Sequence, residues 1–108
     1  MTEVDKELTQ LIEAVKHSRT YKEYDRARVT LKSDPELMAR VYEYRMQNFE
    51  LQNSVDDGTL HDRIDKFYTD NMELSEEPRV RAFLNAELAL CRMLQAISEG
   101  VVEGIDFE

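Results

Sequence analysis

Residues 78–104 read PRVRAFLNAELALCRMLQAISEGVVEG, and they predict one long helix with very little polar surface. A helix on the surface of a globular protein needs one apolar stripe and a charged face opposite to it. Here the polar side chains line up as a single narrow strip, which Leu88 interrupts. A helix of this kind has to be covered from several directions. We therefore expect it to be the buried centre of an all-α fold.

The composition supports one helical domain over residues 1–108. Three glycines and two prolines leave few turns, which favours long helices over a many-stranded β fold. No stretch approaches the roughly 18 uncharged apolar residues of a membrane-spanning helix. The first ten residues, MTEVDKELTQ, are charged and have no apolar segment, so we expect no secretory signal and a cytoplasmic location.

Upstream of the long helix, apolar residues recur every three or four positions, as in amphipathic helices. This spacing predicts helices over residues 3–17, 20–33, 34–55 and 59–75. The short turn Asp56-Asp57-Gly58-Thr59 makes the last two an antiparallel hairpin. The predicted fold is this hairpin, residues 34–75, packed along the helix of residues 78–104 in a helical-bundle dimer.

Several polar residues predict where the helices begin and how the hairpin is aligned. Asp34 can cap the helix that Pro35 opens, although Ser33 and Glu36 offer an alternative capping box. Gly58 can take the left-handed conformation that ends a helix, and Thr59 resembles the cap of the next one. Asn48 and Asn71 each place an amide in the hairpin seam. They either pair across it or lie at its wet edge.

A second apolar row on the long helix predicts a dimer. Burying that row against a second chain would remove an apolar patch larger than a soluble monomer normally exposes. The partner is then another copy of this chain or a close paralogue. The predicted interface consists of Phe83, Leu90, Leu94, Ile97 and Val101.

The chain lacks the usual residues of a catalytic or metal site. Cys91 is the one cysteine, and its apolar neighbours predict a small buried side chain. His17 and His61 stand alone, and no glycine-rich phosphate loop exists. We therefore expect neither an enzyme nor a cofactor. Arg45 and Glu87 interrupt apolar rows, and they form either a register-setting pair or part of a small-ligand pocket, as in some small helical enzymes.

The net charge of −9 argues against direct binding of nucleic acid, because phosphate affinity comes mainly from Lys and Arg. One segment is locally basic and could face a partner protein: Arg19, Lys22, Arg26 and Arg28. Two tyrosines lie close to it, Tyr21 and Tyr24, and the other three of the chain are Tyr42, Tyr44 and Tyr68. Tyrosines at helical spacing are either core-edge residues or, beside arginines, a stacking platform for single-stranded RNA.

The long helix resembles the C-terminal helix of the YlbF/YmcA family of Firmicutes. The family pattern is roughly V-x-x-F-x-x-A-E-x-x-L followed by apolar residues, and here it begins at Val80. Phe83, Ala86 and Glu87 carry its most specific part. The upstream order is similar too, with Asp34-Pro35-Glu36-Leu37 opening a long helix. The resemblance covers nearly the whole chain.

The resemblance implies a small, helical, cytoplasmic and usually dimeric protein that acts by binding other proteins. Similar members support competence, sporulation and biofilm development, and some join a complex that modulates mRNA processing by RNase Y. The expected function is therefore that of a non-catalytic regulator or adaptor with an RNA-processing protein as a possible partner. An iron–sulfur cluster associated with that complex depends on cysteines, and Cys91 alone cannot ligate one. A purely structural helical oligomer is the alternative.

Overall fold

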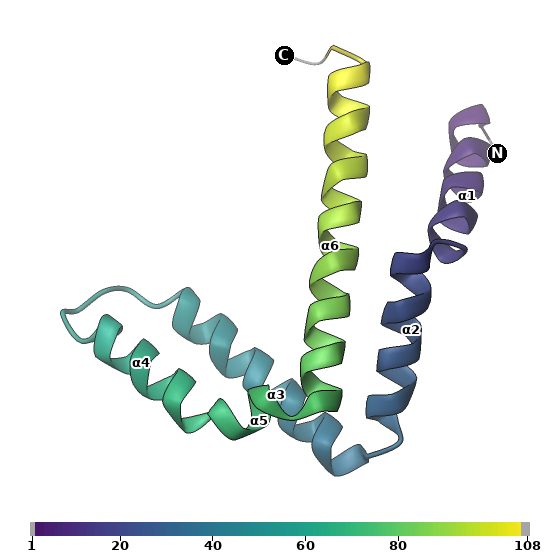
Figure 1. Cartoon of the computed structure of the whole chain (residues 1–108). Coiled ribbons are helices and arrows are strands. Elements are labelled where there is room, and N and C mark those ends of the chain that lie inside the picture. Colours follow the sequence, from purple (N-terminus) through teal and green to yellow (C-terminus); the bar gives the residue numbers. More distant parts are fainter. Residues whose placement is uncertain (1, 107–108) are drawn as a thin grey trace. The chain divides into compact units, whose positions relative to one another are not determined.

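The computed structural model describes residues 2–106, and every regular element within them is a helix (Figure 1). The all-α prediction is therefore confirmed. No helix in this range is long and apolar enough to cross a membrane. The helices in chain order are α1 (Glu3–Lys16), α2 (Arg19–Lys32), α3 (Pro35–Gln52), α4 (Leu60–Asp70), α5 (Met72–Glu76) and α6 (Pro78–Gly104).

The chain divides into two compact units. The first contains the chain up to Arg28 together with the chain from Phe83 onward, and the second contains Val29–Ala82. The hairpin lies in the second unit, whereas most of α6 lies in the first. Packing of the hairpin along α6 therefore stays a prediction.

In the first unit, α2 packs on α6. The ring of Tyr24 lies 5.9 Å from the ring of Phe83, and Phe83 is only 2% exposed. The break between α1 and α2 is stabilised by Ser18, whose hydroxyl donates to the carbonyl of Val15 and accepts from the backbone N–H of Tyr21. The two N-terminal helices are thus separate elements, and a serine cap sets the start of the second.

In the second unit, Asp34 and Pro35 start α3 as predicted. The Asp34 carboxylate accepts a hydrogen bond from the backbone N–H of Leu37 at 3.1 Å, and Pro35 occupies the first turn. This satisfies one of the N–H groups that a helix start leaves without a partner. The buried apolar core of this unit comprises Leu31, Leu37, Met38, Val41, Leu74 and Val80.

The hairpin of α3 and α4 has the predicted turn but different helix ends. Gly58 adopts a φ of +95°, as expected. However, α3 ends at Gln52 rather than at residue 55, and Thr59 makes no side-chain cap. Asp57 instead accepts hydrogen bonds from both the backbone N–H and the hydroxyl of Thr59, at 3.0 and 2.6 Å. The loop is therefore longer than predicted and is closed by an aspartate.

The predicted helix over residues 59–75 is interrupted at Asn71, which separates α4 from α5. The Asn71 amide donates to the carbonyl of Phe67 at 2.8 Å, a local bond that competes with regular helix. Asn71 therefore does not pair with Asn48. The partner of Asn48 is Tyr68, whose hydroxyl donates to the Asn48 side-chain oxygen at 3.2 Å.

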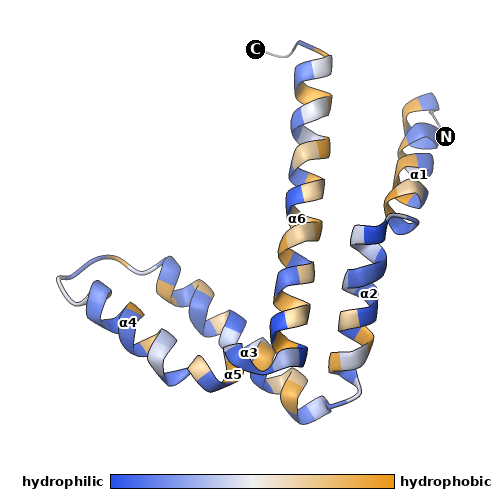
Figure 2. Cartoon of the chain, in the orientation of Figure 1, coloured by the Kyte–Doolittle hydropathy of each residue, from blue (hydrophilic) through white to orange (hydrophobic). Residues whose placement is uncertain are grey.

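The long helix has the predicted bounds, but in this chain it is far from buried. Apolar residues recur along its whole length (Figure 2), and several of them are exposed. Cys91 is exposed as well, so the prediction that it is a buried hydrophobe is wrong. A single chain of this size covers only part of a 27-residue helix.

Candidate interaction surfaces

An apolar groove lies in the first unit, between α1 and α6, with a volume of about 380 Å³. It forms because α1 presents apolar residues at a 3–4 spacing to a matching row on α6. We call it the α1–α6 groove. Lys16 is its one charged lining residue, and the others are Leu8, Leu11, Ile12, Val15, Tyr21, Leu90, Leu94 and Ile97.

The predicted interface residues on α6 differ in how far the chain covers them. Phe83 is buried against Tyr24, whereas Leu90 and Ile97 are half-buried in the α1–α6 groove. Leu94 is 47% exposed and Val101 is 56% exposed. The structure therefore brings three of the five together in the groove, and a dimer through them stays a prediction.

The predicted basic patch lies on α2 and is partly neutralised within that helix. Arg19 donates to Glu23 at 2.9 Å, and Arg28 pairs with Asp25. The hydrogen bond that Arg28 donates to the Asp25 carboxylate raises the pKa of Arg28 above its ordinary value, although burial opposes it. The Arg28 guanidinium also lies 5.4 Å from the centre of the Tyr24 ring, a cation–π contact.

The remaining cations of the patch line a shallow hollow of about 360 Å³. Lys22 and Arg26 contribute to it, together with His17, Arg19 and Glu23. Because Tyr24 packs on Phe83, its ring is not an open stacking platform. The tyrosine beside the basic patch is thus a core-edge residue.

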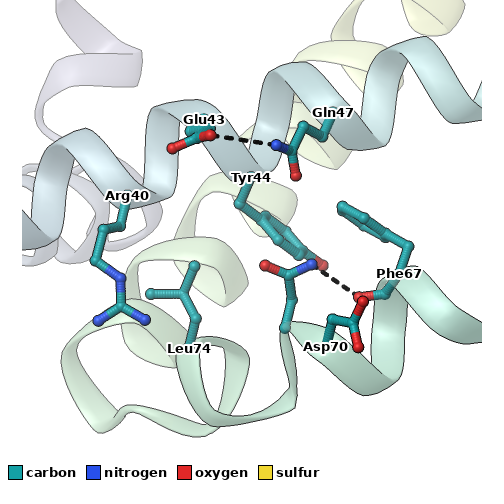
Figure 3. A pocket seen from close by; sticks show the side chains of 8 residues that line it. Arg40, Glu43, Tyr44, Gln47, Phe67, Asp70 and Leu74 are labelled. Atoms are coloured by element: carbon teal, nitrogen blue, oxygen red, sulfur yellow. Dashed lines mark hydrogen bonds between the residues drawn. The ribbon is translucent and has the colours of Figure 1, made fainter.

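The second unit has a polar groove on one side of the hairpin, with a volume of about 320 Å³ (Figure 3). We call it the hairpin groove. Its eight residues form two rows, each at i, i+3, i+4 and i+7; the first row is one face of α3, and the second continues from α4 through Asn71 into α5. They are Arg40, Glu43, Tyr44 and Gln47 from α3, and Phe67, Asp70, Asn71 and Leu74 from the chain of α4 and α5.

Two aromatic rings form the apolar part of the hairpin groove. The ring centres of Tyr44 and Phe67 are 5.2 Å apart at an interplanar angle of 20°, so the rings are stacked. Burial raises the pKa of Tyr44, and the nearby Tyr68 adds to the effect. The Tyr44 hydroxyl therefore loses its proton at a higher pH than an ordinary tyrosine does. Tyr44 and Asn71 lie on helix faces that the apolar spacing predicts, but that spacing does not predict a groove between the two rows.

A family model described as "Control of competence regulator ComK, YlbF/YmcA" matches residues 4–106. The match spans almost the whole chain, including both units. The chain belongs to the YlbF/YmcA family. Neither the search of curated proteins nor the search of solved structures gave a significant match. The family described by this model is one of regulators.

The iron–sulfur cluster implied for some YlbF/YmcA proteins does not fit the residues of this one. The chain has a single cysteine. Within residues 2–106, no group of three or more Cys, His, Asp or Glu side chains is arranged to hold a metal ion. Arg45 and Glu87 are placed on α3 and α6, one in each unit, and a pocket near them stays a prediction.

Proposed function

We propose that this YlbF/YmcA protein is a non-catalytic regulatory adaptor and that it works through protein–protein contacts made by the α1–α6 groove. Membership in a family described as controlling the competence regulator ComK supports a regulatory role. The observation that carries the proposal is the groove itself, an apolar hollow with a single charged lining residue. Such a surface favours apolar side chains of another protein over a polar substrate.

The proposed occupant of the groove is α6 of a second copy or of a close paralogue. Leu94 and Val101, which are 47% and 56% exposed, lie on the same side of α6. Burying apolar surface contributes about 25 cal/mol per Å², so covering a continuous row strongly favours association. A two-fold symmetric contact uses the same surface of both chains, and an apolar row on one helix is self-complementary.

Sedimentation equilibrium tests the dimer. We expect a dimer for the wild type at tens of micromolar, and a folded monomer for Leu94→Glu, because the substitution would bury an unpaired carboxylate in the interface. Gln95→Glu is the matched control, since it adds the same charge one position along α6 at an exposed polar residue. A wild-type mass near 12.7 kDa would contradict the proposal.

Affinity purification from the native cells tests the adaptor role. We expect specific co-purifying proteins, among them components of competence control or of RNase Y-dependent mRNA processing. The bait should be compared with Leu94→Glu, which removes the α1–α6 groove contact, and with Gln95→Glu. A wild-type dimer that captures no protein beyond those captured by unrelated helical bait would instead indicate a purely structural oligomer.

A further inference from the structure

The loop between α3 and α4 contains the one place in this sequence where an Asp or Asn precedes a glycine, Asp57-Gly58. At such a pair the backbone nitrogen of the glycine can attack the side-chain carboxyl of the aspartate, because glycine has no Cβ to obstruct the approach. Within a regular helix the backbone holds these two groups apart. Residues 53–59 lie outside the helices, however, and both Asp57 and Gly58 are exposed.

The loop has room for such a reaction at Gly58. Among residues 2–106, apart from the two chain neighbours, no heavy atom lies within 4 Å of the position that a Cβ would take there. A ring formed from Asp57 and Gly58 would therefore displace no packed side chain on this side of the turn.

Hydrogen bonds restrain both reacting groups in the folded loop. Oδ1 of Asp57 accepts from the backbone N–H and from the hydroxyl of Thr59, at 3.0 and 2.6 Å, and the Arg63 guanidinium lies 3.6 Å from it. The Gly58 N–H donates to Oδ1 of Asp56 at 2.9 Å. Ring closure would draw the Asp57 carboxyl carbon toward the Gly58 nitrogen, so the bonds to Thr59 would have to break first.

The ionisation of Asp57 adds to this restraint. The hydrogen bonds from Thr59 lower the pKa of Asp57 below its ordinary value. Attack on the carboxyl group has to expel an oxygen, and a protonated acid can release it as water whereas a carboxylate cannot. The Thr59 hydroxyl therefore slows the reaction in two ways, by holding the carboxylate in place and by keeping it ionised.

We propose that Asp57 is a site of spontaneous isoaspartate formation and that the Thr59 hydroxyl restrains this reaction in the folded chain. First, the Gly58 nitrogen bonds to the side-chain carboxyl carbon of Asp57. The carboxyl hydroxyl and the amide proton leave as water, and a succinimide ring results. Water then adds to the ring. Opening at the former backbone carbonyl leaves that carbonyl as a free carboxylate and directs the main chain through the side chain, whereas opening at the other carbonyl restores aspartate.

Isomerisation would change the turn without changing the net charge. The backbone between α3 and α4 would become one carbon atom longer, and the free carboxylate would no longer extend from a side chain toward Thr59 and Arg63. The bonds that close the loop would then be lost. The site lies in the second unit, apart from the α1–α6 groove, so the inference does not depend on the proposed function.

Peptide mapping of the full-length protein, aged at neutral pH and physiological temperature, tests the proposal. We expect isoaspartate to accumulate at position 57 ahead of every other position, and faster in denaturing urea than in buffer, because unfolding frees Asp57 from Thr59. Thr59→Val removes the hydroxyl and keeps the size of the side chain. In buffer it should react about threefold faster than the wild type or more, since a bond to a charged group is lost. In urea the two rates should be equal.

Matched variants separate the hydroxyl from a general loosening of the hairpin. Thr59→Ser keeps the hydroxyl and should react at the wild-type rate, as should Tyr68→Phe, which removes a hairpin bond elsewhere. Asp57→Glu keeps the charge and should show no isomer, because the larger imide ring forms far more slowly. Circular dichroism before ageing checks that each variant is folded. The proposal is overturned if another position isomerises faster than Asp57, or if Thr59→Val in buffer reacts no faster than the wild type or Thr59→Ser.

Discussion

The guanidinium of Arg79 lies 3.3 Å from the carboxylate of Asp34, a residue 45 positions earlier in the chain. Both belong to helix starts in the same unit. Asp34 caps α3 through Leu37, and Glu77 accepts hydrogen bonds from the backbone N–H groups of Arg79 and Val80 at 2.8 and 3.1 Å. Arg79 also donates to Glu77 at 2.9 Å. One arginine therefore joins the acidic caps of α3 and α6.

Removing the Asp34 cap should destabilise the protein. We expect Asp34→Ala to lower the free energy of unfolding by about 1 kcal/mol, because the Leu37 N–H loses its acceptor. Asp34→Ser should retain most of the stability, since serine is also a good cap. Urea denaturation measures the difference. Glu50→Ala, an exposed substitution within α3, is the control, and an equal loss in that variant would contradict the cap explanation.

Stability should fall in acid partly through Glu77. Burial raises the pKa of Glu77, but hydrogen bonds from Arg79 and Val80 outweigh it, so the net pKa is below the ordinary 4.5. The folded chain thus binds fewer protons than the unfolded one. The stabilisation is complete above the ordinary pKa and is lost as the pH falls through the lower folded value. Hydrogen bonds from Thr59 lower the pKa of Asp57 as well, so ionised Asp57 also stabilises the folded chain and this stabilisation is also lost in acid.

Urea denaturation at a series of pH values from neutral to acid checks this contribution. Glu77→Gln should flatten the acid side of the stability profile without abolishing its slope, because Asp57 still contributes. Glu76→Gln is the control at the neighbouring exposed carboxylate. An unchanged profile in Glu77→Gln would show that the capping bonds do not depend on the ionised form.

The bond between Tyr68 and Asn48 should contribute modestly to hairpin stability. Tyr68→Phe removes a hydroxyl that donates to Asn48 and accepts from Gln52, and we expect a loss of about 0.5 kcal/mol because the residue is partly in water. Tyr42→Phe removes a hydroxyl from an exposed tyrosine on α3 and should change nothing. Thermal unfolding of both variants measures the difference. Equal midpoints for the two variants would show that the hydrogen bond from Tyr68 to Asn48 does not stabilise the hairpin.

The isolated protein should not bind single-stranded RNA tightly. Its net charge is −9, and two of the four cations in the basic patch pair with Glu23 and Asp25. Fluorescence anisotropy at physiological salt should show no submicromolar affinity. Tight binding that weakens steeply with added salt would mean that Lys22 and Arg26 suffice to hold a phosphate backbone.

The start of α3 and the turn at Gly58 could be predicted because both depend on local chemistry, an aspartate before a proline and a glycine free to take positive φ. The break at Asn71 could not, since the apolar spacing continues through it and only the bond to the Phe67 carbonyl marks the end. The groove residues of α3 and of α4 and α5 recur at i, i+3, i+4 and i+7, but only the structure shows that these two rows face each other. Which polar faces meet depends on how each helix is rotated, which composition does not specify.

The exposed thiol of Cys91 limits what oxidation can do to this protein. Each chain offers one thiol, so a disulfide can join two chains and then has no further thiol with which to extend the product. Oxidative cross-linking therefore terminates at a covalent pair and cannot yield polymers. The same single thiol allows a thiol-specific dye to label α6 at one position in each chain, close to Leu94.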